Sequence, residues 1–149
     1  MSILDSIKQD HEEVKALLEE MADSSRQATG RREEMAVKLT GLLLAHMEGE
    51  EKVFYPRLLE IEDAHEDTLE AFEEHHVAKT LLGELGQTRP EADRWKAKVT
   101  VFTEIIDHHI EEEEDTLFDH AEEAFEDEEL DEMDQEFMRV KQASLRKAA

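Results

Sequence analysis

The chain has 149 residues, with 17 Lys and Arg against 41 Asp and Glu, so its net charge is −24 when histidine is neutral. A surface with this charge repels nucleic acid and anionic lipid, and we therefore expect no nucleic-acid partner and no membrane partner. Cysteine is absent, which excludes disulfides, thiolate metal ligands and cysteine nucleophiles.

The N-terminal segment, MSILDSIKQDHEE, has neither the basic nor the apolar region of a signal peptide. No apolar run in the chain approaches the roughly 20 residues that a membrane-spanning helix needs. We therefore predict a soluble, cytoplasmic protein.

The composition predicts an all-α fold, because proline and glycine occur only two and five times and strong helix formers are frequent. Apolar residues at helical spacing predict five helices, at residues 2–23, 31–61, 64–85, 90–125 and about 128–147. Short connections between long helices favour antiparallel neighbours, so the first four should form an up-down-up-down antiparallel four-helix bundle. We expect a single domain over residues 1–149, with a four-helix core at about 2–125 and an additional C-terminal helix.

Several residues predict where these helices begin or bend. Ser2 should cap the first helix, with Asp5 three residues later in a capping box. Pro56 should kink or interrupt the second helix, because proline removes a backbone donor and crowds the preceding turn. Thr88 should cap the fourth helix, with Glu91 completing a second capping box.

The predicted C-terminal helix has an apolar stripe of its own, formed by Leu130, Met133, Phe137 and Val140. This stripe can dock either on the bundle or on a second copy of the chain. We therefore expect a monomer or a weak homodimer.

An internal repeat carries the chemistry of this chain. At an offset of 64 residues, Asp10-His11 aligns with Glu74-His75. At an offset of 63, His46 aligns with His109, Glu50-Glu51 with Glu113-Glu114, and Leu39, Leu42 and Leu43 with Phe102, Ile105 and Ile106. Each half of the chain therefore offers one single histidine and one His-x-x-x-Glu pair.

The His-x-x-x-Glu spacing places an imidazole and a carboxylate on one face of a helix, one turn apart. Both pairs continue an apolar stripe, so they should point into the core. A buried carboxylate is costly unless it is paired or bound to a metal. The repeated pattern therefore predicts a metal site, and imidazole with carboxylate and no thiolate suits iron, or manganese or zinc in its place.

Other histidines do not share the repeated pattern. We interpret His65 and His120 as surface residues, and His76 and His108 as neighbours of ligands. His108 with Glu112 has the same four-residue spacing as His109 with Glu113, but only the second pair fits the repeat.

These motifs resemble the hemerythrin-like, or HHE cation-binding, domain family. The segments HMEGEEKVFYP, EEHHVAK and HHIEEEE carry the resemblance, which extends to about Phe125. It implies two non-haem iron ions with an oxo or hydroxo bridge. It also implies terminal ligation by the four repeated histidines and bridging by the two glutamates, namely His11, His46, His75, His109, Glu50 and Glu113.

The chain departs from the oxygen-carrying members of that family at one position. Those proteins have a further histidine four residues after the third-helix ligand, where this chain has Lys79. Tyr55 is a second asymmetry, since its counterpart in the repeat is Phe118. On an ideal helix Tyr55 lies half a turn from the ligand face, so it is a candidate ligand or neighbour of the metal only if Pro56 distorts the helix.

The resemblance implies handling of dioxygen, peroxide, nitric oxide or iron. The absence of the fifth histidine favours redox turnover, and we expect decomposition of peroxide, as a catalase does, or another role in oxidative or nitrosative stress. The alternatives are a module that binds or senses dioxygen, nitric oxide or iron without turnover, and a metal-free acidic adaptor.

Overall fold

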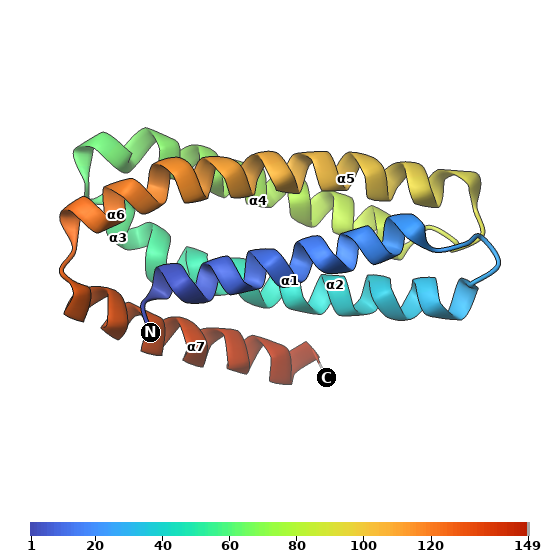
Figure 1. The fold of residues 1–149 in the computed structure, drawn as a ribbon, viewed down its shortest axis with the longest axis horizontal. Helices are drawn as coiled ribbons and strands as arrows, with labels where there is room; N and C mark the ends of the chain where they lie inside the picture. The colour runs from blue at the N-terminus through green and yellow to red at the C-terminus, as the bar shows by residue number, and fades with distance from the viewer. Residues whose placement is uncertain (149) are drawn as a thin grey trace.

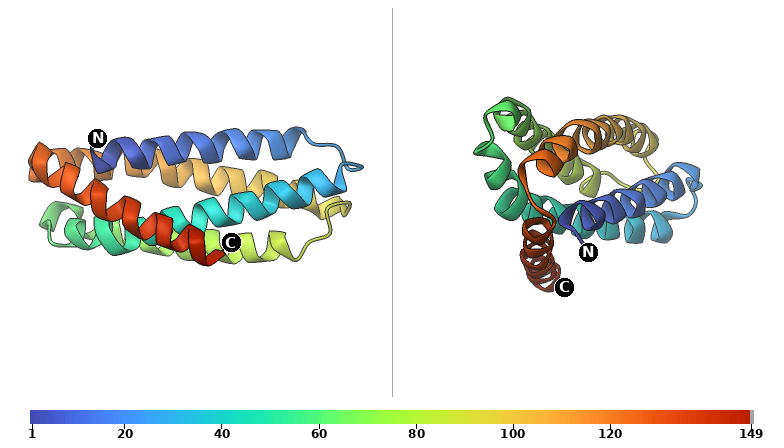
Figure 2. Two further views of the ribbon diagram at one scale, coloured as in Figure 1. Left: turned by 90° about the horizontal axis from the view of Figure 1, so that it is seen from below. Right: turned by 60° about the vertical axis from the view of Figure 1, so that its left-hand side comes forward.

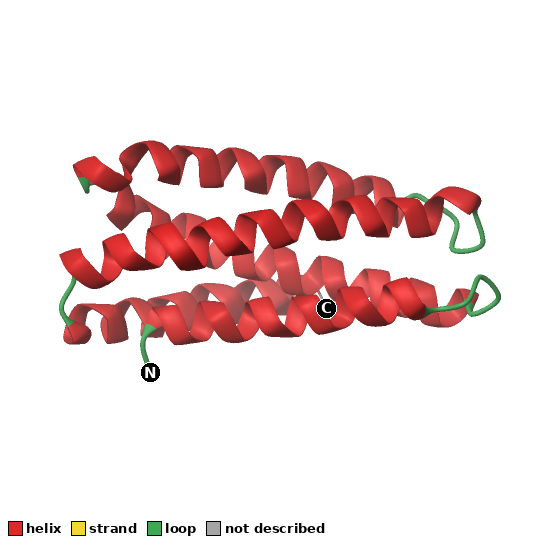
Figure 3. Ribbon diagram, turned by 45° about the horizontal axis from the view of Figure 1, so that its top comes forward, coloured by secondary structure: helices red, strands yellow, loops and turns green. Residues whose placement is uncertain are grey.

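The structure, a computed structural model, describes residues 1–148, and every secondary-structure element in that range is helical. The four long helices α1 (Ile3–Asp23), α2 (Thr29–Gly49), α4 (His65–Gly86) and α5 (Asp93–Glu112) form a bundle (Figure 1). The links between α1 and α2 and between α4 and α5 lie at the same end of the bundle (Figure 3). The predicted up-down-up-down four-helix bundle is therefore confirmed. No helix among residues 1–148 is long and apolar enough to cross a membrane.

Two of the long helices each contain one wide turn. A π-helical turn at Glu50–Phe54 follows α2 directly and leads into α3 (Tyr55–Leu59). A second one at Glu113–Leu117 follows α5 and leads into α6 (Phe118–Ala124). The two π-helical turns are 63 residues apart, the same offset that relates the two His-x-x-x-Glu pairs.

Pro56 therefore does not interrupt its helix, as the sequence allowed, and it does not by itself explain the distortion. The chain remains helical up to Leu59, and the wide turn ends two residues before the proline. The same turn occurs at Glu113–Leu117, where no proline follows. What the two turns share is a buried glutamate at their first position, and π-helical turns are frequent at functional sites.

The predicted caps have opposite outcomes. The Ser2 capping box is confirmed, because the Ser2 hydroxyl accepts from the N–H of Leu4 at 3.1 Å and Asp5 accepts from the N–H of Ser2 at 3.2 Å. The Thr88 capping box is wrong. The Thr88 hydroxyl donates to the carbonyl of Glu84 at 2.7 Å, at the end of α4, and α5 begins only at Asp93. A threonine between two helices can form a hydrogen bond with a free backbone group of either helix. Here its hydroxyl bonds to a free carbonyl of the preceding helix.

The C-terminal helix α7 (Asp127–Ala148) lies against α1, α2 and the first π-helical turn (Figure 2). Leu130, Met133 and Phe137 are buried in this contact. Of the two docking modes that the sequence left open, this is docking on the bundle of the same chain. A short 3₁₀ turn at Glu62–Ala64 completes the set of elements by joining α3 to α4.

The apolar core is divided into two clusters along the bundle. One contains Leu18, Leu39, Leu82 and Phe102. The other contains Ile7, Phe54, Leu58, Phe118 and Phe137. Along α1 the buried residues between Ile7 and Val14 are Asp10 and His11, so the polar residues of the repeat lie between the two clusters. Apolar packing on both sides holds them in place.

Gly49 allows α7 to approach the bundle closely. A Cβ atom at this position would lie 2.6 Å from Cε1 and 2.7 Å from Cδ1 of Phe137, whose side chain is fully buried. Gly41, earlier on the same helix, has open space around its Cα. The two glycines therefore differ in what they do, although both look like weak spots in a helix.

We expect Gly49→Ala and Gly41→Ala to change stability in opposite directions. Overpacking against Phe137 costs about 1–3 kcal/mol, which exceeds the gain of about 1 kcal/mol that alanine brings to a helix. At Gly41 only that gain remains. Chemical denaturation of both variants measures the difference, and equal stabilisation by both would show that α7 does not pack on Gly49 in solution.

Candidate metal centre

The structure brings the six residues of the repeated pattern together in the middle of the bundle. His11 lies on α1, His46 on α2, His75 on α4 and His109 on α5, while Glu50 and Glu113 begin the two π-helical turns. All six are buried, with at most 6% of their surface exposed.

The six residues form two groups that share both carboxylates. One group is His11, His46, Glu50 and Glu113, and the other is Glu50, His75, His109 and Glu113. Within each group the potential ligand atoms lie within 4.8 Å of one another. Two cations with two bridging carboxylates and two terminal imidazoles each would match this arrangement.

The distances point the same way. Nε2 of His46 and Nε2 of His75 lie 3.0 and 3.1 Å from the same oxygen of Glu50. Nε2 of His11 lies 3.1 Å from Oε1 of Glu113, and Nε2 of His109 lies 3.6 Å from its Oε2. The second glutamate thus faces one histidine from each half of the chain.

Several of these atoms are buried without a hydrogen-bond partner among residues 1–148. They are Nε2 of His11 and His46, both carboxylate oxygens of Glu50, and Oε1 of Glu113. Buried polar atoms without partners are rare and costly in a folded chain. Since they converge on two points and are all nitrogen or carboxylate oxygen donors, a pair of metal ions fits them.

Each of the four histidines has a second carboxylate behind it. Nδ1 of His11 contacts Glu114 at 2.7 Å, and Nδ1 of His46 contacts Asp10 at 2.8 Å. In the other half, Nδ1 of His75 contacts Glu51 at 2.8 Å and Nδ1 of His109 contacts Glu74 at 2.7 Å. An acceptor at Nδ1 leaves Nε2 free to face the centre and fixes the orientation of the ring, as is usual for histidines that bind metals.

The role of these four carboxylates was not predicted from the sequence, although the repeat contains all four. Each is a chain neighbour of one inner residue and supports the histidine of a different helix. Asp10 and Glu74 precede His11 and His75, and Glu51 and Glu114 follow Glu50 and Glu113. The signal was their presence at both aligned positions of the repeat.

Lysines neutralise two of these supporting carboxylates. Nζ of Lys141, from α7, lies 2.5 Å from Asp10, and Nζ of Lys79 lies 2.9 Å from Glu51. Lys79 stands where the oxygen carriers have their additional histidine. It reaches a supporting carboxylate and not the centre itself.

Without a metal, protonated imidazoles balance the negative charge of the buried carboxylates. Burial lowers the pKa of His46, but the charge of the adjacent Glu50 and the hydrogen bond to Asp10 outweigh it and raise that pKa to about 10. Burial is likewise outweighed at His75, where the close contact with the Glu50 carboxylate and the hydrogen bond to Glu51 raise the pKa to about 9. Burial raises the pKa of Glu50, yet the imidazole of His46 holds it well below its usual range. A metal ion entering the site would displace the imidazole protons.

Tyr55 reaches the second group. Its hydroxyl donates to Oε2 of Glu113 and lies 3.2 Å from Nε2 of His75 and 3.4 Å from Nε2 of His109. The side chain is fully buried, and this burial, together with the nearby charge of Glu113, raises the pKa of the phenol well above its usual value.

The first π-helical turn explains this position. The N–H of Tyr55 bonds to the carbonyl of Glu50, five residues back, so one extra residue is accommodated in the turn. His46, Glu50 and Tyr55 consequently lie one above another on the same face. The counterpart of Tyr55 in the repeat, Phe118, is apolar and packs against Phe54. The hydroxyl of Tyr55 therefore has no counterpart in the second half of the repeat.

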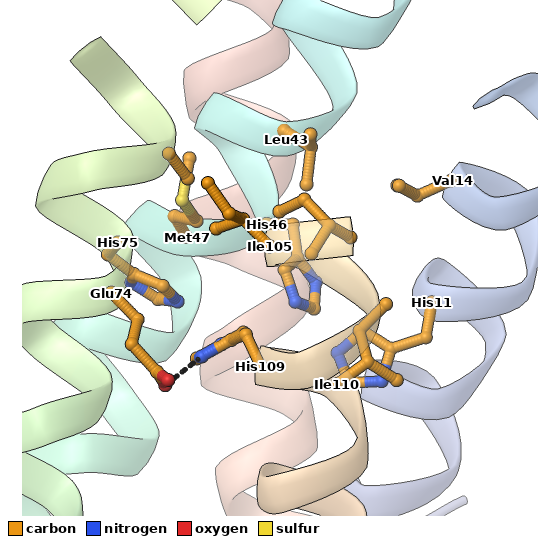
Figure 4. A pocket seen from close by; sticks show the side chains of 12 residues that line it. His11, Val14, Leu43, His46, Met47, Glu74, His75, Ile105, His109 and Ile110 are labelled. Carbon is orange, nitrogen blue, oxygen red and sulfur yellow. Dashed lines mark hydrogen bonds and ion pairs between the residues drawn. The ribbon is translucent and has the colours of Figure 1, made fainter. Parts of the chain in front are cut away.

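A small cavity adjoins the four histidines and is lined by side chains from α1, α2, α4 and α5 (Figure 4). Its volume of about 10 Å³ is enough for one molecule of the size of water. Apolar side chains form much of its wall, among them Val14, Leu43, Met47 and Ile110. A small ligand at the centre would therefore be surrounded by hydrocarbon.

The remaining histidines lie outside the centre. His65, His76 and His108 are exposed and His120 is half-buried. The His108 side chain is 65% exposed, whereas that of the neighbouring His109 is 7% exposed. Of the two possible registers on α5, the structure brings His109 and Glu113 to the centre.

The fold and the buried cluster define a class of protein, the helical bundle with a histidine–carboxylate metal-binding site. The chain belongs to the hemerythrin HHE cation-binding domain family, whose family model matches residues 2–121. The resemblance drawn from its motifs is thereby confirmed.

Two known proteins are similar to this chain. A protein of Nostoc sp. named "DNA nickase" is 33% identical over 118 residues, which are 79% of this chain and 33% of the relative, so the chain spans about a third of that protein's length. The crystal structure of a hemerythrin HHE cation-binding domain-containing protein from Mycobacterium kansasii superposes with a TM-score of 0.86. It covers 99% of this chain and 89% of the other at 20% identity, which shows a shared fold.

Proposed function

We propose that His11, His46, His75, His109, Glu50 and Glu113 hold two iron ions and that the chain decomposes hydrogen peroxide. The observation that carries the proposal is the pair of donor groups sharing two glutamates. In the overall reaction, two molecules of hydrogen peroxide give two of water and one of dioxygen, so one molecule is reduced while the other is oxidised. No external reductant is needed.

The donor set favours iron. Imidazole and carboxylate without thiolate suit iron, with manganese and zinc as substitutes, and zinc has no redox chemistry to offer. A pair of iron ions can exchange two electrons with peroxide, which is the chemistry the chain itself lacks.

The side chains around the centre have separate tasks in this proposal. The four supporting carboxylates hold the imidazole rings in one orientation. The apolar walls of the adjoining cavity limit access to small molecules and keep bulk water out. The Tyr55 hydroxyl stays protonated because its pKa is raised, so it can donate a hydrogen bond to Glu113 or to a small molecule bound beside it.

Lys79 argues for turnover over reversible oxygen carriage. As a lysine it contributes no imidazole to the centre. Its ammonium group pairs with Glu51, and its side chain is 41% exposed. One position at the centre is then left for Tyr55, water or substrate. A module that binds or senses dioxygen, nitric oxide or iron without turnover is the second candidate, favoured by the smallness of the cavity.

The name of the Nostoc relative, of which this chain spans one third, refers to nicking of DNA. Contact with a phosphate backbone is electrostatically unfavourable for a chain with a net charge of −24. We therefore expect supercoiled plasmid to stay intact when it is incubated with the iron-loaded chain.

Addition of hydrogen peroxide to the iron-loaded chain is expected to release dioxygen over many turnovers, at half a mole per mole of peroxide. An oxygen electrode measures this. The Tyr55→Phe variant removes only the hydroxyl at the second group, and we expect it to keep its iron and to turn over about a hundredfold more slowly, at the low end of the roughly 10²–10⁴-fold range of a positioned proton donor. A long-lived coloured oxygen adduct without peroxide consumption would instead favour the binding module.

A further inference from the structure

A second and smaller group of metal-binding side chains lies at the surface beside the buried centre. It consists of Glu74 from α4 and His108 and Glu112 from α5, whose potential ligand atoms lie within 4.8 Å of one another. Nε2 of His108 lies 3.2 Å from Glu112 and 3.8 Å from Oε2 of Glu74. His108 and Glu112 are exposed, so this group is open to solvent.

Glu74 connects this surface group to the buried centre. Its Oε1 accepts a hydrogen bond from Nδ1 of His109 at 2.7 Å, as the dashed line in Figure 4 shows, while its Oε2 faces His108. One carboxylate therefore supports an inner histidine with one oxygen and faces the surface group with the other.

A hollow between α4 and α5 lies next to this group. Its volume is about 100 Å³, and its lining includes the carboxylates of Asp67, Glu70, Glu74 and Glu112. The lining also includes two residues of the buried centre, His109 and Glu113. Glu113 is 1% exposed, and its Oε1 has no hydrogen-bond partner among residues 1–148. The hollow thus borders both the acidic surface and a carboxylate of the buried centre.

In the part of the chain that the structure describes, Glu74 differs from its counterpart in the repeat by having no lysine partner. Asp10 is the counterpart of Glu74 in the repeat, and it pairs with Lys141 from α7. Glu51 pairs with Lys79. Within residues 1–148, the ion-pair partners of Glu74 are His108 and His109 only, with no lysine or arginine. Where its counterpart has an ammonium group, Glu74 has an imidazole and a second carboxylate.

We propose that Glu74, His108 and Glu112 form an uptake site for a divalent cation, which passes from there through the acidic hollow to the buried centre. This inference rests on the proposed metal centre but not on peroxide turnover. One imidazole and two carboxylates at the surface suffice to bind a divalent ion of the iron and cobalt kind weakly. The carboxylates of the hollow raise the local cation concentration and so speed association.

The test is the rate at which the metal-free full-length chain takes up Co²⁺, followed by stopped-flow absorption. The double variant His108→Ala/Glu112→Gln removes two donors of the uptake site and none of the buried centre. Its control is His76→Ala/Glu111→Gln. It makes the same two kinds of substitution on α4 and α5, at exposed positions outside the hollow. We expect the double variant to take up Co²⁺ about tenfold more slowly at low concentration, with the same final stoichiometry, and the control to match the unchanged chain.

A second measurement uses the iron-loaded chain. Electron paramagnetic resonance of free Mn²⁺ should reveal one weakly bound extra ion that is lost in the double variant and kept in the control. Equal uptake rates in all three chains, or an extra Mn²⁺ that survives in the double variant, would overturn the uptake site alone. An unchanged chain that binds no metal at all would overturn the buried centre, and the uptake site with it.

Discussion

Removal of the metal ions is expected to lower the melting temperature of the chain by about 10 °C. A ligand present at a thousandfold excess over its Kd stabilises the fold by about 4 kcal/mol, and for a chain of this length 1 kcal/mol corresponds to roughly 2–4 °C. The six inner residues are held in one place by packing on both sides, so they cannot move apart when the ions leave. Dialysis against a chelator, followed by calorimetry with and without added iron, measures the effect.

The size of this effect should depend on pH in a definite direction. In the metal-free chain the pKa of His46 is raised to about 10 and that of His75 to about 9. A group whose pKa is raised by folding stabilises the fold fully at pH values below its pKa in the unfolded chain, near 6.5. This contribution is lost as the pH rises through its pKa in the folded chain. Metal binding, which displaces those protons, becomes more favourable over the same range. The difference in melting temperature should therefore widen between about pH 6.5 and pH 9.

Two results would contradict this reasoning. Equal melting temperatures with and without iron would contradict the proposed metal centre. An iron content near zero would contradict it as well. A difference that shrinks as the pH rises would keep the metal but show that protons do not occupy His46 and His75 in its absence.

The buried cluster was predictable because two weak signals were repeated. His11 alone, or His46 with Glu50 alone, would be an ordinary pattern on an acidic helix. Their recurrence as His75 and as His109 with Glu113, at nearly constant offset, made them a set. The same periodicity that marks an apolar stripe also gave the direction of each side chain, and so the fold and the cluster were predicted together.

Other features depend on contacts that no periodicity encodes. The π-helical turns lie where a buried glutamate and the next inward residue both face the centre. A pattern based on 3.6 residues per turn does not predict the extra residue of such a turn. That turn is what moves Tyr55 from the side of its helix to the centre. The close approach of Phe137 to Gly49 and the pairing of Lys141 with Asp10 join residues far apart in the sequence, and the repeat contains no counterpart of α7.

The Thr88 cap failed for a related reason. The sequence contains a threonine with a glutamate three residues later, and this pattern is shared by helix starts and helix ends. The choice between them is made by the free carbonyl of Glu84, which is a property of the folded neighbour.

His109→Ala is expected to reduce the iron content to about one ion per chain or fewer and to abolish peroxide turnover. The substitution removes the only side chain of α5 that offers an imidazole to the second group, and it leaves Glu74 without its buried partner. Iron analysis of the purified variant and an oxygen-electrode trace measure both losses.

The matched control is the same substitution one residue earlier. A shift of one residue turns a helical side chain by about 100°, so His108 and His109 cannot both face one centre. With a side chain 65% exposed, His108 contacts Glu112 and Glu74 at the surface. His108→Ala should therefore keep nearly all of its iron when the metal is supplied in excess, and most of its turnover, even if it takes up the metal more slowly. Iron loss in His108→Ala with full iron in His109→Ala would overturn the register of α5, and with it the alignment that pairs His109 and Glu113 with His46 and Glu50.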